Sequence, residues 1–203
     1  MIEPTDPDRA FALGHVPRAG RKAVAALWAL DEQLGQIVAS TTQPMVGQMR
    51  LLWWRDALST GVSGHPVLAE LTSVFACGID AEALGEIIDG WEELLEPLPL
   101  TEAQLAAFAT QRGTRLFSLT AQICGVTCPD AAGAGWALAD FALRCSDPVT
   151  SSRALKMVRE HLAPLDLKAA PRPLRILVRL ALADATAGRR LVRTPWKLLR
   201  SVA

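Results

Sequence analysis

Apolar residues recur every three or four positions along almost the whole chain, and this spacing constrains the fold more than any other feature. Over residues 21–40 it gives one helix an apolar face made of Ala23, Ala26, Leu27, Leu30, Leu34, Ile37 and Val38. The same spacing, bounded by start and stop residues, predicts further helices over 41–61, 64–78, 80–99, 100–125, 130–147, 147–165, 171–188 and 194–203. Gly113 is expected to bend the longest of them.

No stretch alternates between apolar and polar residues with the period of two that half-buried strands show. We therefore predict an all-α protein, folded as a single-domain helical bundle. The 203 residues, half of them apolar, suffice for one substantial core, and a second full domain is not expected. Prolines interrupt residues 163–173. Residues 1–162 are thus predicted to form the main helical domain, and residues 163–203 to form basic C-terminal helices that pack on it.

Charge is unevenly distributed along the chain, although the formal net charge is zero. A balanced composition does not indicate nucleic-acid binding. From Asp80 to Glu102 there are eight acidic residues and no Lys or Arg, whereas from Arg172 onward there are eight basic residues and one acid. Two solvated helix faces explain this, and one acidic stripe is formed by Glu82, Glu86, Asp89, Glu93 and Glu96. Contact of the basic end with anionic lipid or an acidic partner is the alternative.

The C-terminal segment 189–203 mixes basic residues with leucines and one tryptophan, a composition typical of helices that lie on membrane surfaces. A last helix that packs Trp196 into the core explains it equally well. No run approaches the roughly 18 consecutive apolar residues of a transmembrane helix. The N-terminus lacks the basic and apolar regions of a secretory signal. We expect a cytoplasmic protein, with peripheral contact at the inner membrane through residues 189–203.

Cysteine and histidine positions predict neither a metal site nor a cofactor. The four cysteines have no C-x-x-C spacing, and the three histidines lie far apart in the chain, with no partner three or four residues away. Free thiols are the expected state of Cys77, Cys124, Cys128 and Cys145.

Two adjacent tryptophans lie between two arginines in MRLLWWRDALSTG, residues 49–61. The block is Arg50, Trp53, Trp54, Arg55 and Asp56. Either it packs into the core or it forms an anion site. We favour the core interpretation, in which both tryptophans pack between helices and the arginines are neutralised by neighbouring acids or lie across an indole face.

This block resembles the marker of the squalene/phytoene synthase family: RLLWWRDAL is followed by Gly61 and then His65-Pro66-Val67. Weaker matches come in the family's order, and the resemblance covers about residues 8–145; they are RKAVAALWALDEQLGQI, IIDGWEELLEPLPLTEAQLAAFATQRGT and AGAGWALADFALR. The resemblance implies an isoprenoid synthase fold, with helices around an apolar cavity. Enzymes of the family join two prenyl diphosphates, and two D-x-x-x-D clusters hold the Mg²⁺ that neutralises the leaving group.

The chain departs from the family at both aspartate clusters. The first cluster would fall at Gly35, Gln36 and Ala39, none of which is acidic, and Glu32 stands where the family has an arginine. In the second region Asp140 and Asp147 are seven residues apart and form no compact clamp. Asp31 and Glu32 are the candidate residual acids, with Asp56 on the next helix, but we favour surface charge as their role. The C-terminal helices also appear shortened relative to the family.

The family resemblance, taken with the missing aspartate clusters, leads to two alternative functions. The first is a protein without catalytic residues or a bound metal, which binds an isoprenoid or lipid or helps a protein partner to assemble. It resembles a divergent subgroup that includes the mitochondrial complex I assembly factor with a squalene/phytoene synthase-like domain. The alternative is a residual prenyl-diphosphate transferase that uses Mg²⁺ and atypical acids. Neither function involves nucleic acid.

Overall fold

A computed structural model describes residues 2–61 and 64–193, and in these two ranges every regular element is helical. The elements are α1 (Pro7–Leu13), α2 (Arg21–Ser40), α3 (Pro44–Thr60), α4 (Pro66–Glu70), α5 (Thr72–Phe75), α6 (Ala81–Glu92), η1 (Glu93–Leu95), α7 (Glu102–Phe108), η2 (Ala109–Thr114), α8 (Arg115–Ile123), α9 (Asp130–Ala142), α10 (Pro148–Leu162) and α11 (Arg172–Ala187). The prediction of an all-α, single-domain bundle is confirmed. None of the described helices is long and apolar enough to cross a membrane.

Local sequence explains where most helices begin and end. The side chains of Asp6, Asp80 and Asp147 accept hydrogen bonds from the first backbone amides of α1, α6 and α10. Thr101 and Gln104 form a reciprocal capping box at α7. Gly61 ends α3 in the left-handed conformation, which a residue without Cβ adopts without strain.

Three regions differ from the predicted helices. The short helix α1 was not predicted, because seven residues do not show enough periodicity. The single helix expected over 64–78 is two shorter ones, α4 and α5. The helix expected over 100–125 is interrupted by the π-helical segment η2, which contains Gly113. The helix expected over 194–203 lies outside the described residues.

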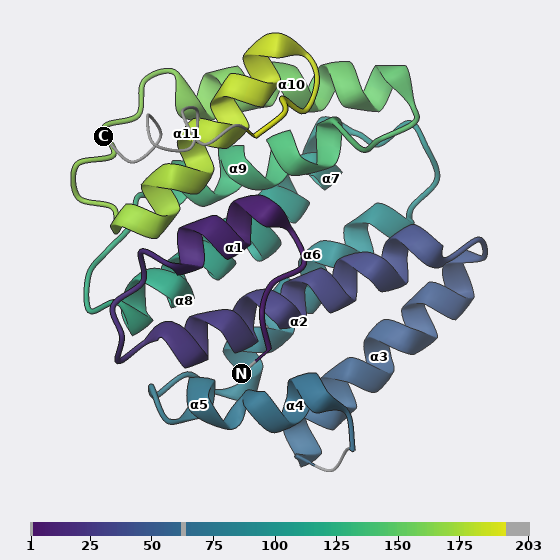
Figure 1. The fold of residues 1–203 in the computed structure, drawn as a ribbon. Coiled ribbons are helices and arrows are strands. Elements are labelled where there is room, and N and C mark those ends of the chain that lie inside the picture. Colours follow the sequence, from purple (N-terminus) through teal and green to yellow (C-terminus); the bar gives the residue numbers. More distant parts are fainter. Residues whose placement is uncertain (1, 62–63, 194–203) are drawn as a thin grey trace.

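α2 runs through the middle of the bundle (Figure 1). α3, α4 and α5 lie on one side of it, and α9, α10 and α11 lie on the other, with α1 between α2 and α11. The segment η2 and α9 cross very closely, since a Cβ on Gly113 would lie 2.3 Å from the Gly133 carbonyl oxygen. Two glycines at this crossing let the backbones of η2 and α9 approach each other this closely.

Candidate functional site

A cavity of about 800 Å³ opens between α2, α6 and α9. Its wall includes Gly35, Gln36 and Ala39, the three positions where the family that the sequence resembles has its first aspartate cluster. Asp31 and Glu32 line it from the same helix, and Asp140 lines it from α9. Residues 35–39 match the first aspartate cluster, and Asp140 lies in the region of the second. The structure brings these two regions, which are far apart in sequence, to one cavity. Asp147, the other acid noted in the second region, caps α10 instead.

Asp31 lies at the floor of this cavity and is completely buried, so the prediction that it is surface charge is wrong. Arg9 and Arg112 both form ion pairs with it, and Arg112 does so through two nitrogens, at 2.9 and 3.0 Å. The indole N–H of Trp91 donates a fourth hydrogen bond, 2.7 Å long. Burial alone would raise the pKa of Asp31, but the two guanidiniums outweigh it and hold this pKa well below its usual range.

Arg112 is enclosed by aromatic rings as well as by carboxylates. Its guanidinium carbon lies 4.0 Å from the ring centroid of Trp91, 4.9 Å from that of Trp136 and 5.3 Å from that of Phe108. Such stacking stabilises a desolvated cation. Burial would lower the pKa of Arg112, but Asp31 and Asp140 raise it above its ordinary value, so the side chain stays charged.

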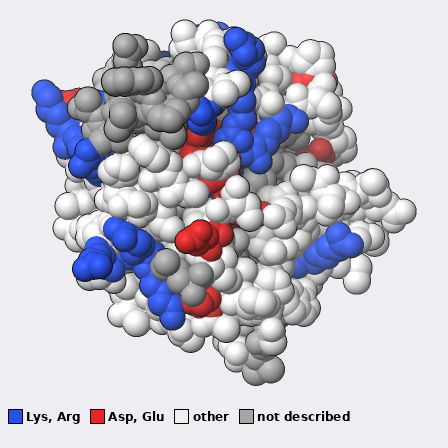
Figure 2. Space-filling model, viewed as in Figure 1, with Lys and Arg blue, Asp and Glu red and all other residues white. Residues whose placement is uncertain are grey.

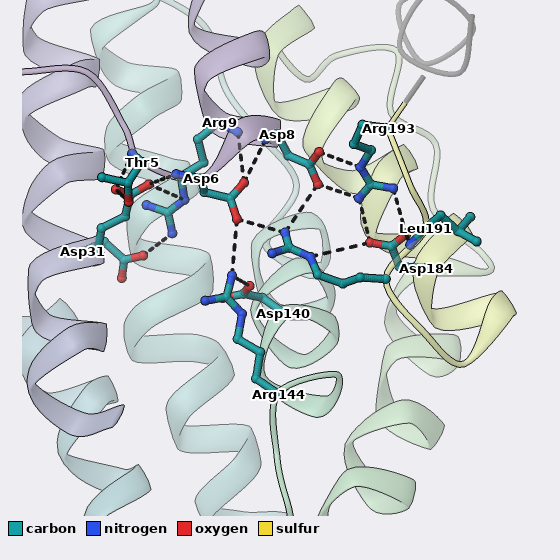
Figure 3. Close-up of polar contacts among 12 residues, drawn as sticks. Thr5, Asp6, Asp8, Arg9, Asp31, Asp140, Arg144, Asp184, Leu191 and Arg193 are labelled. Atoms are coloured by element: carbon teal, nitrogen blue, oxygen red, sulfur yellow. Dashed lines mark hydrogen bonds and ion pairs between the residues drawn. The ribbon is translucent and has the colours of Figure 1, made fainter. Parts of the chain in front are cut away.

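Asp140 connects this buried cluster to a second, more exposed one. It accepts hydrogen bonds from Arg112 at 3.0 Å and pairs with Arg144 at 2.8 Å. Figure 3 shows how the chain of contacts continues across α1, α9 and the segment after α11. There the carboxylates of Asp6, Asp8 and Asp184 meet the guanidiniums of Arg144, Arg190 and Arg193.

Two basic residues of the C-terminal segment are therefore already paired. Arg193 donates to Asp8 at 2.6 Å and to Asp184 at 2.8 Å, and Arg190 pairs with Asp6 at 2.9 Å. These acids raise the pKa values of Arg190 and Arg193, against the effect of burial. Arg190 also lines the cavity. The predicted membrane contact through 189–203 stays a prediction, and most of that segment lies outside the described residues.

Glu32 ties the N-terminal segment to α2. Its carboxylate accepts hydrogen bonds of 2.7 Å from both the backbone N–H and the hydroxyl of Thr5, and one of 3.1 Å from the Asp6 N–H. Arg9 lies 3.9 Å away. These hydrogen bonds hold the segment that precedes α1 against α2.

The carboxylates of Asp31 and Asp140 do not fit the Mg²⁺ ions that the resemblance implies. Both oxygens of Asp31 are bonded to arginines or to Trp91, and both oxygens of Asp140 are bonded to arginines. Magnesium takes six oxygen ligands in octahedral array, several of them waters, and needs one or two carboxylates that are free to bind it. In residues 2–61 and 64–193 no group of three His, Cys, Asp or Glu side chains is arranged to hold a metal ion.

The tryptophan block divides between core and surface. Trp54 is 3% exposed and stacks edge-on against His65, as predicted. Trp53 is 48% exposed, so the prediction that both indoles pack between helices is wrong for this one. Arg55 pairs with Asp89 of α6. Asp56 is exposed.

The acidic stripe of α6 is partly paired. Besides Asp89 with Arg55, Glu86 pairs with Arg115 of α8. Both side chains stay in contact with solvent, as the prediction of a solvated face requires, and ion pairs are added at these two positions. Both carboxylates are about 40% exposed, so each pair contributes little stability.

Sequence reasoning missed the two cations of the cavity floor, Arg9 and Arg112, and the donor Trp91. Arg112 gave no usable signal, because most of its neighbours in the chain, Thr110, Gln111, Thr114 and Arg115, are polar. An arginine there is fully buried only when carboxylates from other helices meet it, and no local pattern shows that. All four cysteines are free, and Cys145 lines the cavity, where burial raises the pKa of its thiol.

Comparison with known proteins identifies a matching family model and a solved structure of similar fold. The family model for squalene/phytoene synthase matches residues 2–145. A solved structure described as a dehydrosqualene synthase in complex with ligand is similar over 98% of this chain and 90% of that one, with a TM-score of 0.67 and 12% sequence identity. At that identity the likeness concerns the fold. No curated protein sequence matches the chain.

Proposed function

Because the chain belongs to the squalene/phytoene synthase family, we propose that it is a non-catalytic member that holds an uncharged isoprenoid or similar lipid in the central cavity. The observation that carries this proposal is the engagement of the cavity carboxylates by arginines. Asp31 and Asp140 face the cavity from α2 and α9, and each is neutralised by two guanidiniums. Protein cations thus take the place that metal ions have in the enzymes.

The charge of the cavity wall supports an uncharged ligand. Its acids are Asp6, Asp31, Glu32, Glu96 and Asp140, and its bases are Arg9, Arg112, Arg144 and Arg190. With five carboxylates against four guanidiniums, the wall has no surplus positive charge for a diphosphate. A buried multiply charged anion is stable only beside metal ions or unpaired cations. A diphosphate would have to break existing ion pairs to bind.

The remaining wall suits an apolar chain. Trp91, Leu94, Leu98, Leu100 and Phe141 contribute hydrocarbon surface to the cavity. A volume near 800 Å³ falls within the range of ordinary small-molecule sites. The hydrophobic effect would then supply most of the binding free energy.

Two assays on the purified protein test the proposal. The first incubates it with farnesyl or geranylgeranyl diphosphate, Mg²⁺ and NADPH and measures released pyrophosphate. The second measures displacement of a fluorescent apolar probe by farnesol and by farnesyl diphosphate. We expect no pyrophosphate, and displacement by the alcohol at lower concentration than by the diphosphate. Turnover, or a preference for the diphosphate, would contradict the proposal.

A variant that fills the cavity tests whether the ligand binds there. Val38→Trp inserts an indole into the cavity wall and should abolish displacement by farnesol. Val149→Trp, at an exposed position of α10 outside the cavity, is the matched control and should bind as the wild type does. Equal binding by both variants would contradict binding in the cavity.

Residual prenyl-diphosphate transfer with atypical acids is the second candidate. Its support is that Asp31 and Asp140 do face one cavity from opposite helices, as two metal-binding clusters would. It predicts Mg²⁺-dependent pyrophosphate release that Asp140→Asn abolishes. A role as an assembly helper for a protein partner stays a prediction from the family resemblance.

A further inference from the structure

Helix α3 exposes a continuous apolar stripe to solvent. Met45 is 73% exposed, Met49 66%, Leu52 56% and Trp53 48%, and Val46 lies beside them. Their spacing of three and four residues places all five on one face of the helix. The opposite face is buried in the core through Leu51, Trp54, Ala57 and Leu58. The helix is therefore apolar on both sides, although only one side has a partner in the described chain.

Single exposed apolar residues are ordinary, but a contiguous stripe marks an interaction surface. The other large exposed apolar residues of the described chain are scattered, at Phe75, Leu98, Val126, Val149 and Val192. The surface over α3 is largely uncharged in Figure 2. The stripe thus stands out from the rest of the described surface.

The flank of the stripe carries a cation. Arg50 is exposed and has no ion pair among the described residues, whereas Arg55 further along the helix is paired. An arginine beside an apolar helix face can reach the phosphate level of a bilayer while its stem stays among apolar groups. Tryptophan is favoured at the same depth, because its ring is apolar and its N–H needs a polar partner. Asp56 ends the stripe one turn beyond Leu52 and Trp53.

A groove lies beside the stripe, on the side of α2 that also borders the central cavity. It has a volume of about 710 Å³, and Arg50, Trp53 and Ile37 are among its lining residues. Gln36 and Ala39 line both this groove and the cavity. The groove therefore borders the stripe on α3 and shares part of its α2 wall with the cavity.

We propose that the exposed face of α3 docks on a lipid bilayer, with Met45, Met49 and Leu52 among the acyl chains and Arg50 at the phosphates. The unpaired cation beside the stripe and the groove behind it favour a bilayer over a second copy of the chain. Docking through α3 places the groove against the bilayer, which is a source of apolar ligands. This inference goes beyond the proposed function, since docking does not require that the cavity hold a ligand.

Vesicle flotation of the full chain tests the docking surface. Vesicles of phosphatidylcholine, and of phosphatidylcholine with phosphatidylglycerol, should both carry the wild-type protein. Binding should persist at high salt, because one cation contributes less than four or five inserted apolar side chains. Met49→Glu and Leu52→Glu should each lower the bound fraction about tenfold or more. Val149→Glu, at an equally exposed apolar position on α10, is the matched control and should float like the wild type.

Brominated lipids give a second readout that does not depend on the amount bound. Bromine on the acyl chain quenches nearby tryptophan fluorescence, and of the described tryptophans only Trp53 is exposed. Trp53→Phe should remove most of this quenching while leaving flotation nearly unchanged. Thermal unfolding of each variant should match the wild type, because the substituted side chains lie outside the core.

Three results would overturn the proposal. The first is flotation of Met49→Glu equal to that of wild type. The second is binding that is lost at high salt, which would assign the contact to basic residues instead. The third is a concentration-dependent dimer that Met49→Glu converts to monomers, with no flotation of the wild type, which would make the stripe an interface between two copies. The farnesol assay of Met49→Glu in solution, expected to be unchanged, separates failure of docking from failure of cavity binding.

Discussion

The floor of the cavity buries charged side chains, whereas the exposed face of α3 presents apolar side chains to water. At the floor, Arg9, Asp31 and Arg112 are buried together, at a position where a lipid-binding cavity would be expected to be apolar. On α3, Met49 and Trp53 face water, where a polar surface would be expected. The first arrangement is stable only because every charge meets an opposite one. The second has no such compensation within the described chain, and this is the reason for proposing that it docks on a bilayer.

Removal of the central carboxylate should have the largest effect on the cavity floor. Asp31→Ala removes the carboxylate that two buried guanidiniums share, which leaves Arg112 only Asp140 and Arg9 only the more distant Glu32. It is expected to lower the free energy of unfolding by about 3–5 kcal/mol. Asp56→Ala, on the exposed part of α3, should change it by less than about 0.5 kcal/mol. Urea unfolding of both variants measures the difference. A loss of under about 1 kcal/mol for Asp31→Ala would show that the cluster is not required for folding.

The adjacent tryptophans test the same contrast within one helix. Trp54→Ala should destabilise the protein by about 3–4 kcal/mol, because it leaves a cavity in the core. Trp53→Ala should cost less than about 1 kcal/mol, since the side chain is half exposed. Equal losses in urea unfolding would mean that Trp53 is buried in solution, by a second copy or by another part of the chain.

Acid should weaken the ionic clusters and leave the α3 face unaffected. Arg190 and Arg9 outweigh the burial that would raise the pKa of Asp6, so this pKa, like that of Asp31, lies below its ordinary value. An unfolded aspartate titrates near pH 3.9, so the stabilisation is complete above about pH 4 and is lost as the pH falls toward the folded pKa values.

The expected curve of unfolding free energy against pH is therefore level between about pH 7 and 5 and falls below about pH 4. The curve of Asp31→Asn should fall less steeply than that of the wild type, because one carboxylate with a lowered pKa is gone. Met49→Ser should follow the wild-type curve. An Asp31→Asn curve as steep as that of the wild type would contradict the assignment to this carboxylate.

The smallest effect is expected at the C-terminal segment. Arg193 is largely buried between Asp8 and Asp184, but Arg190 is substantially exposed, and exposed ion pairs contribute little. Arg190→Gln should lower the free energy of unfolding by about 0.5 kcal/mol and Arg193→Gln by about 1–2 kcal/mol. Hydrogen exchange of the Leu191 amide, which donates to Asp184, reports whether the segment has detached. No change in either variant would mean that the segment is not held by these pairs.

Much of the fold follows from local sequence, and little of the site does. The long helix α2 begins and ends as predicted, because its periodicity extends over twenty residues. The short helix α1 gives no such signal, yet it carries Arg9 to the cavity floor. The positions of Gly35, Gln36 and Ala39 were found through the family resemblance, and the structure places all three on the cavity wall.

The sequence by itself determined the helical class, the helix boundaries set by caps and prolines, and the family, because these depend on residues close together in the chain. Only the tertiary structure decided what the charges and tryptophans do. Asp31 and Arg112 are 81 residues apart, so their pairing appears only once the bundle brings α2 and η2 to the same cavity. Trp53 and Trp54 are neighbours with the same chemistry, and the side of α3 that meets the bundle decides which one is core and which one is available for binding.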